Sequence, residues 1–313
     1  MNDTSDLVRN LRSRNAKTVA LQFPEGLKRK AAELASSLKE AGFSVIISGD
    51  PCYGACDLAL DALASADVLV HVGHAPVDAR DNVIFLPHTV DIDPGIVDQA
   101  IPFLKGPVTG LVTTVQHAGR IPDMQAVLEK RGIRVSVAEG SGRTPLRGQV
   151  LGCNFAAARN TGAEEILVVA TGLFHAIGVA IATRARVVAL DPVTGIAQEV
   201  DGDALLRRRF AAIERAKGAT EFGILLSSKS GQQRRDLAHR LSSLHPRSVI
   251  VLMQEVSPDE LLNLGFGAYV NTACPRLAYD DQVRFPVPVL APQEFEILCG
   301  VRTWDDYAID EIV

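Results

Sequence analysis

The segment TVALQFPEGLKRKAAELASSLKEAGFSVII, residues 18–47, decides the fold class. Its first six residues are mostly apolar or β-branched and predict a buried strand, which the Pro-Glu-Gly sequence at 24–26 ends. Apolar side chains at helical spacing then predict a helix over residues 27–41, and residues 43–47 predict a second strand. A strand, a helix and another strand in this order predict a right-handed crossover between parallel strands.

The same alternation continues along the chain and returns twice. Further strands are predicted over residues 67–72, 82–86, 108–115, 133–137, 165–170, 186–190, 222–226, 248–253, 268–271 and 287–290. Further helices are predicted over residues 57–66, 124–131, 154–161, 174–183, 232–244 and 258–264. We therefore predict an α/β fold of three similar βαβαβ domains with parallel sheets, over residues 1–100, 101–197 and 198–313, arranged around a central site. The alternative is one large doubly wound sheet.

Composition narrows the class of protein. The 313 residues exceed the roughly 250–300 at which one hydrophobic core stops growing, so several domains are expected. A net charge of −5 disfavours a nucleic-acid partner. The N-terminal residues are polar, and no apolar run approaches the roughly 20 residues of a membrane span. We expect a cytoplasmic protein with no nucleic-acid or membrane partner, in which the odd count of five cysteines forms no disulfide framework.

Three of the cysteines occupy similar places in the repeats. Cys56, Cys153 and Cys274 each follow a predicted strand, one in each repeat, on a turn of small or polar residues. The carboxyl ends of parallel strands form the binding crevice of open α/β sheets. If the repeats pack around a pseudo-threefold axis, three thiolates can converge and suit a [4Fe–4S] cluster with one iron open to a substrate.

The alternative for any one of these cysteines is a small core residue. Cys52 and Cys299 have no counterparts in the other repeats, and we assign them to packing. The pair formed by Cys52 and Cys56 is separated by three residues, which is unlike the C-x2-C spacing of redox dithiols and zinc ribbons.

Short motifs spread over nearly the whole chain carry a family resemblance. They lie at residues 21–27, 53–57, 114–117, 152–154, 172–175, 190–195, 228–232, 271–277 and 280–281. In these motifs and their order the chain resembles the archaeal diphthamide-synthesis radical enzymes, the 2-(3-amino-3-carboxypropyl)histidine synthases. The resemblance implies a homodimer of three-domain subunits, with Cys56, Cys153 and Cys274 as the cluster ligands.

The resemblance also implies the reaction. S-adenosylmethionine binds at the open iron, and an electron donor supplies the reduced cluster. The bond from sulfur to the γ-carbon breaks, which gives methylthioadenosine and a 3-amino-3-carboxypropyl radical or its iron-bound equivalent. That fragment adds to the imidazole C2 of one histidine in elongation factor 2, the first step of diphthamide synthesis. No catalytic side chain beyond the cluster is assigned.

Turns at the same predicted end as the cysteines supply candidate S-adenosylmethionine contacts. The predicted set is Gln22, Pro24, Gln116, His117, His175, Ser230, Gly231, Gln232 and Arg276. Backbone amides of the 230–232 turn can bind carboxylate or ribose oxygens, although a plain turn with Ser230 as helix N-cap is the alternative. Arg276 can pair with the substrate carboxylate or with Asp280 or Asp281.

Two other functions stay open at this point. A quinolinate synthase-like dehydratase would use three similar domains and three cluster cysteines, with the open iron as a Lewis acid and no reductant. A non-catalytic α/β binding protein would use its cysteines only for packing. The basic run at 207–209 predicts a solvated helix face.

Overall fold

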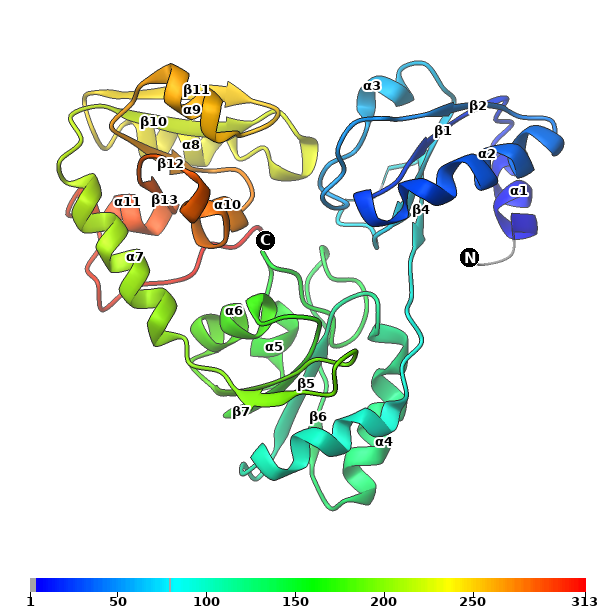
Figure 1. Ribbon diagram of the computed structural model, residues 1–313, viewed down its shortest axis with the longest axis horizontal. Helices are drawn as coiled ribbons and strands as arrows, with labels where there is room; N and C mark the ends of the chain where they lie inside the picture. The colour runs from blue at the N-terminus through cyan, green and yellow to red at the C-terminus, as the bar shows by residue number, and fades with distance from the viewer. Residues whose placement is uncertain (1–3, 79) are drawn as a thin grey trace. The chain divides into compact units, whose positions relative to one another are not determined.

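The computed structural model describes residues 4–78 and 80–313 (Figure 1). The chain divides into two compact units, residues 1–90 and 91–313. Residues 1–3 and 79 belong to the first predicted domain and lie outside the described residues. The second unit contains two of the three sheets.

The first unit is built on a parallel sheet with strand order β2-β1-β3-β4. Its strands are β1 (Thr18–Gln22), β2 (Ser44–Ile47), β3 (Val68–Gly73) and β4 (Val83–Pro87), and its helices are α1 (Thr4–Ser13), η1 (Glu25–Lys30), α2 (Ala31–Glu40) and α3 (Leu60–Leu63). Successive strand residues face opposite sides. Val19 and Leu21 therefore pack in the core that contains Leu34 and Leu38 of α2, whereas Ala20 packs on the other face.

The second sheet has the order β6-β5-β7-β8-β9. Its strands are β5 (Thr109–Thr113), β6 (Val135–Ser136), β7 (Glu165–Val169), β8 (Arg186–Leu190) and β9 (Ala197–Glu199). The helical segments are η2 (Pro94–Phe103), η3 (Ala118–Arg120), α4 (Ile121–Lys130), α5 (Ala156–Asn160) and α6 (Phe174–Thr183). The first four strands are parallel, and β9 adds an antiparallel edge that the sequence did not predict.

The third sheet has the order β11-β10-β12-β13, all parallel. Its strands are β10 (Phe222–Ser227), β11 (Ser248–Met253), β12 (Ala268–Asn271) and β13 (Val289–Leu290). The helical segments are α7 (Asp203–Ala216), η4 (Ser230–Gln232), α8 (Arg235–Ser242), α9 (Pro258–Leu264), α10 (Arg276–Tyr279), η5 (Asp281–Arg284) and α11 (Pro292–Leu298). The long helix α7 connects the second sheet to the third (Figure 1).

The predicted α/β class with three similar parallel sheets is confirmed, because all three sheets begin with the same strand order, second-first-third-fourth. Several boundaries differ from prediction. The predicted helix over 57–66 shrinks to the four residues of α3, and the helix predicted from residue 27 begins with the tighter turn η1. The helix predicted from residue 232 begins only at Arg235, so Ser230 does not cap it and that alternative is wrong. The domain boundaries at 100 and 197 stay predictions.

The prediction of a solvated basic face at 207–209 is wrong for one of its three residues. Arg207 and Arg208 are exposed, but Arg209 is 1% exposed and forms a bidentate ion pair with the buried Glu294 of α11. It also donates to the carbonyl oxygens of Ala278 and Val289. Arg209 lies one and two turns from other buried residues of α7, so helical spacing places it on the packed face. The Glu294 carboxylate raises the pKa of Arg209 against the effect of burial.

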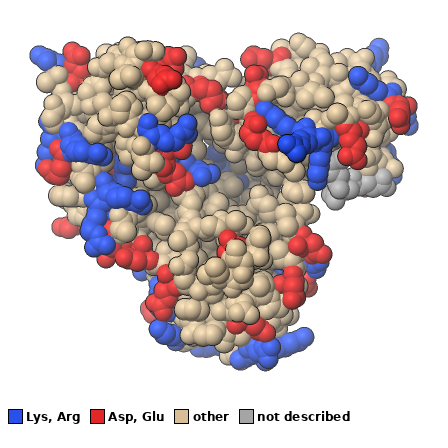
Figure 2. Space-filling model, in the orientation of Figure 1, with Lys and Arg blue, Asp and Glu red and all other residues tan. Residues whose placement is uncertain are grey.

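The helices and the distribution of charged side chains can be compared with these expectations. Among residues 4–78 and 80–313, no helix is long and apolar enough to cross a bilayer. Basic and acidic side chains are intermixed on the face shown in Figure 2.

Candidate functional site

The three predicted ligand cysteines lie at corresponding ends of the sheets. Cys56 follows β2, Cys153 follows β6, and Cys274 follows β12. All three are half-buried. Each therefore lies past the carboxyl end of a parallel strand, at the edge where open α/β sheets bind ligands.

The Cys56 loop, residues 52–59, is supported by Gln22 at the end of β1. The Gln22 side chain is 2% exposed, and its Nε2 donates to the Asp57 carbonyl oxygen at 2.6 Å while its Oε1 accepts from the Ala59 amide at 3.1 Å. Gly54 lies beside the thiol, since a Cβ there would be 3.4 Å from the Cys56 Sγ. Gln22, predicted as a substrate contact, is thus buried against the Cys56 loop and holds the loop backbone by two hydrogen bonds.

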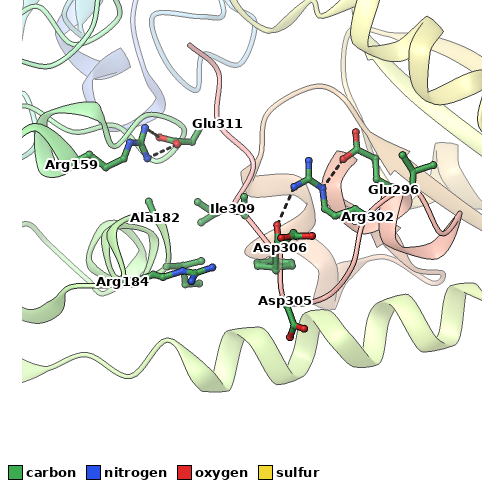
Figure 3. Close-up of a pocket in the computed structure, with 13 residues that line it drawn as sticks. Arg159, Ala182, Arg184, Glu296, Arg302, Asp305, Asp306, Ile309 and Glu311 are labelled. Carbon is green, nitrogen blue, oxygen red and sulfur yellow. Dashed lines mark hydrogen bonds and ion pairs between the residues drawn. The ribbon is translucent and has the colours of Figure 1, made fainter.

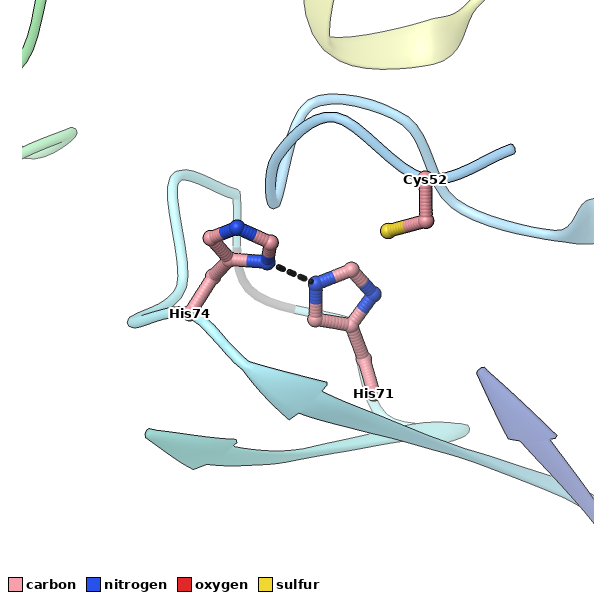
Figure 4. Close-up of side chains that lie close together, drawn as sticks. All are labelled: Cys52, His71 and His74. Carbon is pink, nitrogen blue, oxygen red and sulfur yellow. Dashed lines mark hydrogen bonds between the residues drawn. The ribbon is translucent and has the colours of Figure 1, made fainter. Parts of the chain in front are cut away.

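Two histidines continue the hydrogen-bond chain that begins at Gln22: His71 lies in β3, and His74 directly follows that strand. His71 Nδ1 is 2.8 Å from Gln22 Oε1. Figure 4 shows the next hydrogen bond, in which His71 Nε2 is 2.9 Å from His74 Nδ1. The Cys52 Sγ lies within 4.8 Å of a nitrogen of each ring. Burial, with a smaller effect of His74, lowers the pKa of His71 to about 3; burial also lowers the pKa of His74, which Asp57 opposes. Neither histidine belongs to the set of site residues predicted from the sequence.

The Cys153 turn, residues 151–154, is tight and closely packed. The amides of Leu151 and Asn154 each donate to the carbonyl oxygen of the other, at 3.0 and 3.2 Å. Gly152 packs against α6, because a Cβ there would be 2.3 Å from the Phe174 Cε1. A side chain at this position would have to displace the Phe174 ring, so the close approach requires glycine.

The last residues of the chain return to the Cys153 turn as a segment that we call the C-terminal strap, residues 309–312. The Ile312 amide donates to the Cys153 carbonyl oxygen at 2.8 Å, and the buried Asn154 donates to the Ile312 carbonyl oxygen at 3.1 Å. Glu311 accepts from the Phe155 amide at 2.6 Å and pairs with Arg159 at 2.7 Å.

The same strap supports the Cys274 loop, residues 271–275. Arg234 forms two bonds of 2.7 Å to the buried Asp310 carboxylate. It also donates to the carbonyl oxygens of Thr272 and Ala273, at 2.8 and 3.0 Å. The strap therefore connects the loops of two predicted ligand cysteines.

A second bridge between these loops passes through α6. The Arg276 guanidinium lies over the Phe174 ring, 4.7 Å from its centroid, and Phe174 in turn packs on the Cys153 turn. Arg276 also pairs with Asp280 at 2.9 Å, so the structural alternative for this arginine is present. His175 has a buried Nδ1 with no hydrogen-bond partner among the described residues. Burial, and to a lesser extent Arg276, lowers the pKa of His175 to about 4.

The other predicted contacts lie in the turns that follow β1, β5 and β10. Pro24 packs on Gly73, where a Cβ would be 2.8 Å from its Cγ. His117 is buried at the start of η3, with Gln116 half-buried before it. Ser230 and Gly231 are half-buried and Gln232 is buried in η4. The Gly231 carbonyl oxygen accepts from Arg143 at 3.0 Å, which ties this turn to the second sheet.

A cavity of about 780 Å³ is lined in part by Ile309 and Glu311 of the strap (Figure 3). It is lined by charged groups that largely pair with one another, including Arg159 with Glu311 and Arg302 with Glu296. None of the predicted ligand or substrate residues is among its lining residues. We therefore do not assign the reaction to this cavity.

Comparisons with known proteins agree with the motifs. Residues 23–309 match the family of diphthamide synthesis proteins. A 2-(3-amino-3-carboxypropyl)histidine synthase of Pyrococcus horikoshii is 38% identical over 323 residues, covering 99% of this chain and 93% of its own. Subunit 1 of the corresponding synthase of Nematostella vectensis is 33% identical over 94% of this chain and 66% of its own. The crystal structure of Dph2 from Pyrococcus horikoshii with a 4Fe-4S cluster superposes with a TM-score of 0.93 at 36% identity, covering 99% and 93% of the two chains.

Proposed function

The chain belongs to the diphthamide synthesis family, and on that premise we propose that Cys56, Cys153 and Cys274 together hold its [4Fe–4S] cluster. The activity is that of a 2-(3-amino-3-carboxypropyl)histidine synthase. The 3-amino-3-carboxypropyl group of S-adenosylmethionine is transferred to a histidine of elongation factor 2, which is the first step of diphthamide synthesis. The observation that supports the ligand set is that each cysteine follows a parallel strand of its own sheet, the second strand for Cys56 and Cys153 and the third strand for Cys274.

The residues around these cysteines fit such a cluster. Thiolates are the usual ligands of iron–sulfur clusters. Glycines beside Cys56 and Cys153 leave room next to the thiols or allow the turn to pack closely. A bound cluster would supply an electron to the sulfonium and an open iron position for the substrate. The strap and the Phe174 ring, by contact with the Cys153 turn and the Cys274 loop, hold two of the three ligand positions in a fixed relation.

Arg276 is our candidate for the substrate carboxylate. Its side chain is 56% exposed although it stacks on Phe174 and pairs with Asp280. A guanidinium offers five donors in a planar fork, so donors remain for a second carboxylate. We propose that His175 contributes a neutral imidazole at neutral pH to the same pocket, since its pKa is lowered to about 4. The turns at 24, 116–117 and 230–232 complete the proposed lining, and Gln22 acts by positioning the Cys56 loop.

The family resemblance supports a proposal for the assembly, and the low, odd count of cysteines supports one for the location. We propose a homodimer located in the cytoplasm, reduced by a separate electron donor. Sedimentation of the anaerobic protein tests the dimer: a monomer at micromolar concentration would contradict it.

Mass spectrometry of elongation factor 2 tests the function. The anaerobic, reduced protein is incubated with S-adenosylmethionine and elongation factor 2, and the products are measured. We expect methylthioadenosine and one 3-amino-3-carboxypropyl group on a single histidine. The quinolinate synthase-like alternative predicts neither product, and 5′-deoxyadenosine would show that the bond from sulfur to the ribose 5′-carbon breaks instead.

A further inference from the structure

The hydrogen bonds from Gln22 through His71 to His74 fix the proton positions on both imidazoles. Gln22 must direct its amide nitrogen at the Asp57 carbonyl oxygen and its Oε1 at the Ala59 amide. The Oε1 can therefore only accept a hydrogen bond from His71, whose Nδ1 at 2.8 Å must carry the proton. Each nitrogen of a neutral imidazole has one role, either donor or acceptor.

The tautomer of His74 follows from that of His71. With its proton on Nδ1, His71 presents an unprotonated Nε2, which accepts from His74 Nδ1 at 2.9 Å. His74 therefore keeps its own lone pair on Nε2, and no hydrogen bond to that nitrogen is found among the described residues. Both rings are neutral at pH 7 because the pKa of each is lowered.

His74, which carries this basic nitrogen, follows a strand of the first sheet, as Cys56 does. Gln22 ends β1, and His74 directly follows the neighbouring strand β3. His71 is fully buried, whereas His74 is only partly buried. The Sγ of Cys52, in the Cys56 loop, lies within 4.8 Å of a nitrogen of each imidazole (Figure 4). The group of Cys52, His71 and His74 could also be read as a metal site, but the hydrogen bonds already satisfy the facing ring nitrogens without an ion.

The proposed reaction needs a proton acceptor. When the γ-carbon bonds to C2 of the target imidazole, C2 still carries its hydrogen, and the ring regains aromaticity only if a proton and an electron leave. We propose, on the basis of the proposed function, that His74 Nε2 accepts this C2 proton. The C–C bond forms, the C2–H bond breaks, the proton goes to His74, and the electron returns to the cluster that gave one for cleavage of S-adenosylmethionine. His71 and Gln22 are positioning residues that set the His74 tautomer.

The variant His74→Asn tests the proposal, because an Asn amide can still donate to His71 while the Nε2 base is removed. We expect unchanged iron content and methylthioadenosine formation within about twofold of the parent, with transfer to elongation factor 2 lowered by roughly 10²–10⁴-fold, as for loss of a general base. Deuterium at C2 of the target histidine should slow the residual transfer. His88→Asn, in the same unit but outside this hydrogen-bond chain, should leave both rates unchanged.

Transfer by His74→Asn that stays coupled to methylthioadenosine formation would overturn the proposal, and so would equal loss of both products. Failure of the parent protein to form methylthioadenosine would instead refute the proposed function. The tautomer is tested separately by ¹⁵N spectra of the anaerobic protein labelled at its seven histidines. We expect a protonated Nδ1 and an unprotonated Nε2 at His74, and the opposite tautomer would overturn the proposal without reference to activity.

Discussion

The Cys56 loop and the Cys153 turn occupy the same place in two sheets of like strand order, yet they are held in different ways. The Cys56 loop is fixed from within its own unit by one buried side chain, Gln22 of β1. The Cys153 turn is fixed by the C-terminal strap, whose Ile312 lies 158 residues beyond Asn154. The strap also supports the Cys274 loop through Asp310 and Arg234. A repeated topology thus repeats the ligand position without repeating its support.

The largest effect is expected from substitution of the three proposed cluster ligands. Cys56→Ala, Cys153→Ala and Cys274→Ala should each abolish methylthioadenosine formation and lower the bound iron, because each removes one of the three thiolates. Cys299→Ala is the matched control, since Cys299 packs against the core of the third sheet. Iron analysis and absorbance of the anaerobic proteins check this, and full activity in any of the first three would refute that ligand.

Loss of the strap's contacts should increase the mobility of the Cys153 turn and the Cys274 loop and leave the Cys56 loop unchanged. Asp310→Ala leaves the Arg234 guanidinium without its buried partner, and breaking such a pair costs about 3–5 kcal/mol. We expect faster hydrogen exchange at residues 151–154 and 271–275, with residues 52–59 unchanged. Asp305→Ala, at an exposed aspartate, is the control. An equal rise of hydrogen exchange in all three segments would contradict the proposal that the Cys56 loop and the Cys153 turn are supported separately.

Gln22→Leu should increase hydrogen exchange in the Cys56 loop and leave the Cys153 turn and the Cys274 loop unchanged. It leaves the Asp57 carbonyl oxygen and the Ala59 amide without their partner, at a cost of about 1–3 kcal/mol. Hydrogen exchange should increase in residues 52–59 alone, whereas Gln125→Leu on α4 should change neither region. Protection of residues 52–59 equal to that of the parent would show that Gln22 does not support this loop.

The smallest effect is expected from acidification. Burial holds the pKa of His71 at about 3 in the folded state, against 6.5 for the ordinary group. Between these values the unfolded chain binds a proton that the folded chain does not, so stability falls as the pH drops below about 6.5. From pH 7 to 5.5 the loss from His71 is about 1 kcal/mol. Denaturant unfolding of the parent and of His71→Gln should show a flatter pH profile for the variant, and identical profiles would contradict it.

Structural features that depend on neighbouring residues in the chain could be predicted from the sequence. Strand and helix periods predicted the sheets, and the turn residues around Cys56, Cys153 and Cys274 predicted that these three cysteines follow strands. The supports are not local: nothing near Cys153 in the sequence indicates that Ile312 will bind its turn. A partial signal did exist for the hydrogen-bond chain, because Gln22 and His71 are polar residues inside otherwise apolar strands, and buried polar groups need partners. Arg209 could have been found from its helical spacing to Leu205 and Ala212.

Mössbauer spectroscopy of the ⁵⁷Fe-enriched anaerobic protein shows whether the chain holds a [4Fe–4S] cluster with one iron open to S-adenosylmethionine, as we propose for Cys56, Cys153 and Cys274. We expect about four irons per chain, with about a quarter of the signal changing when S-adenosylmethionine is added, because only one iron lacks a protein ligand. A spectrum that S-adenosylmethionine leaves unchanged, or a protein that binds no iron after anaerobic reconstitution, would contradict it.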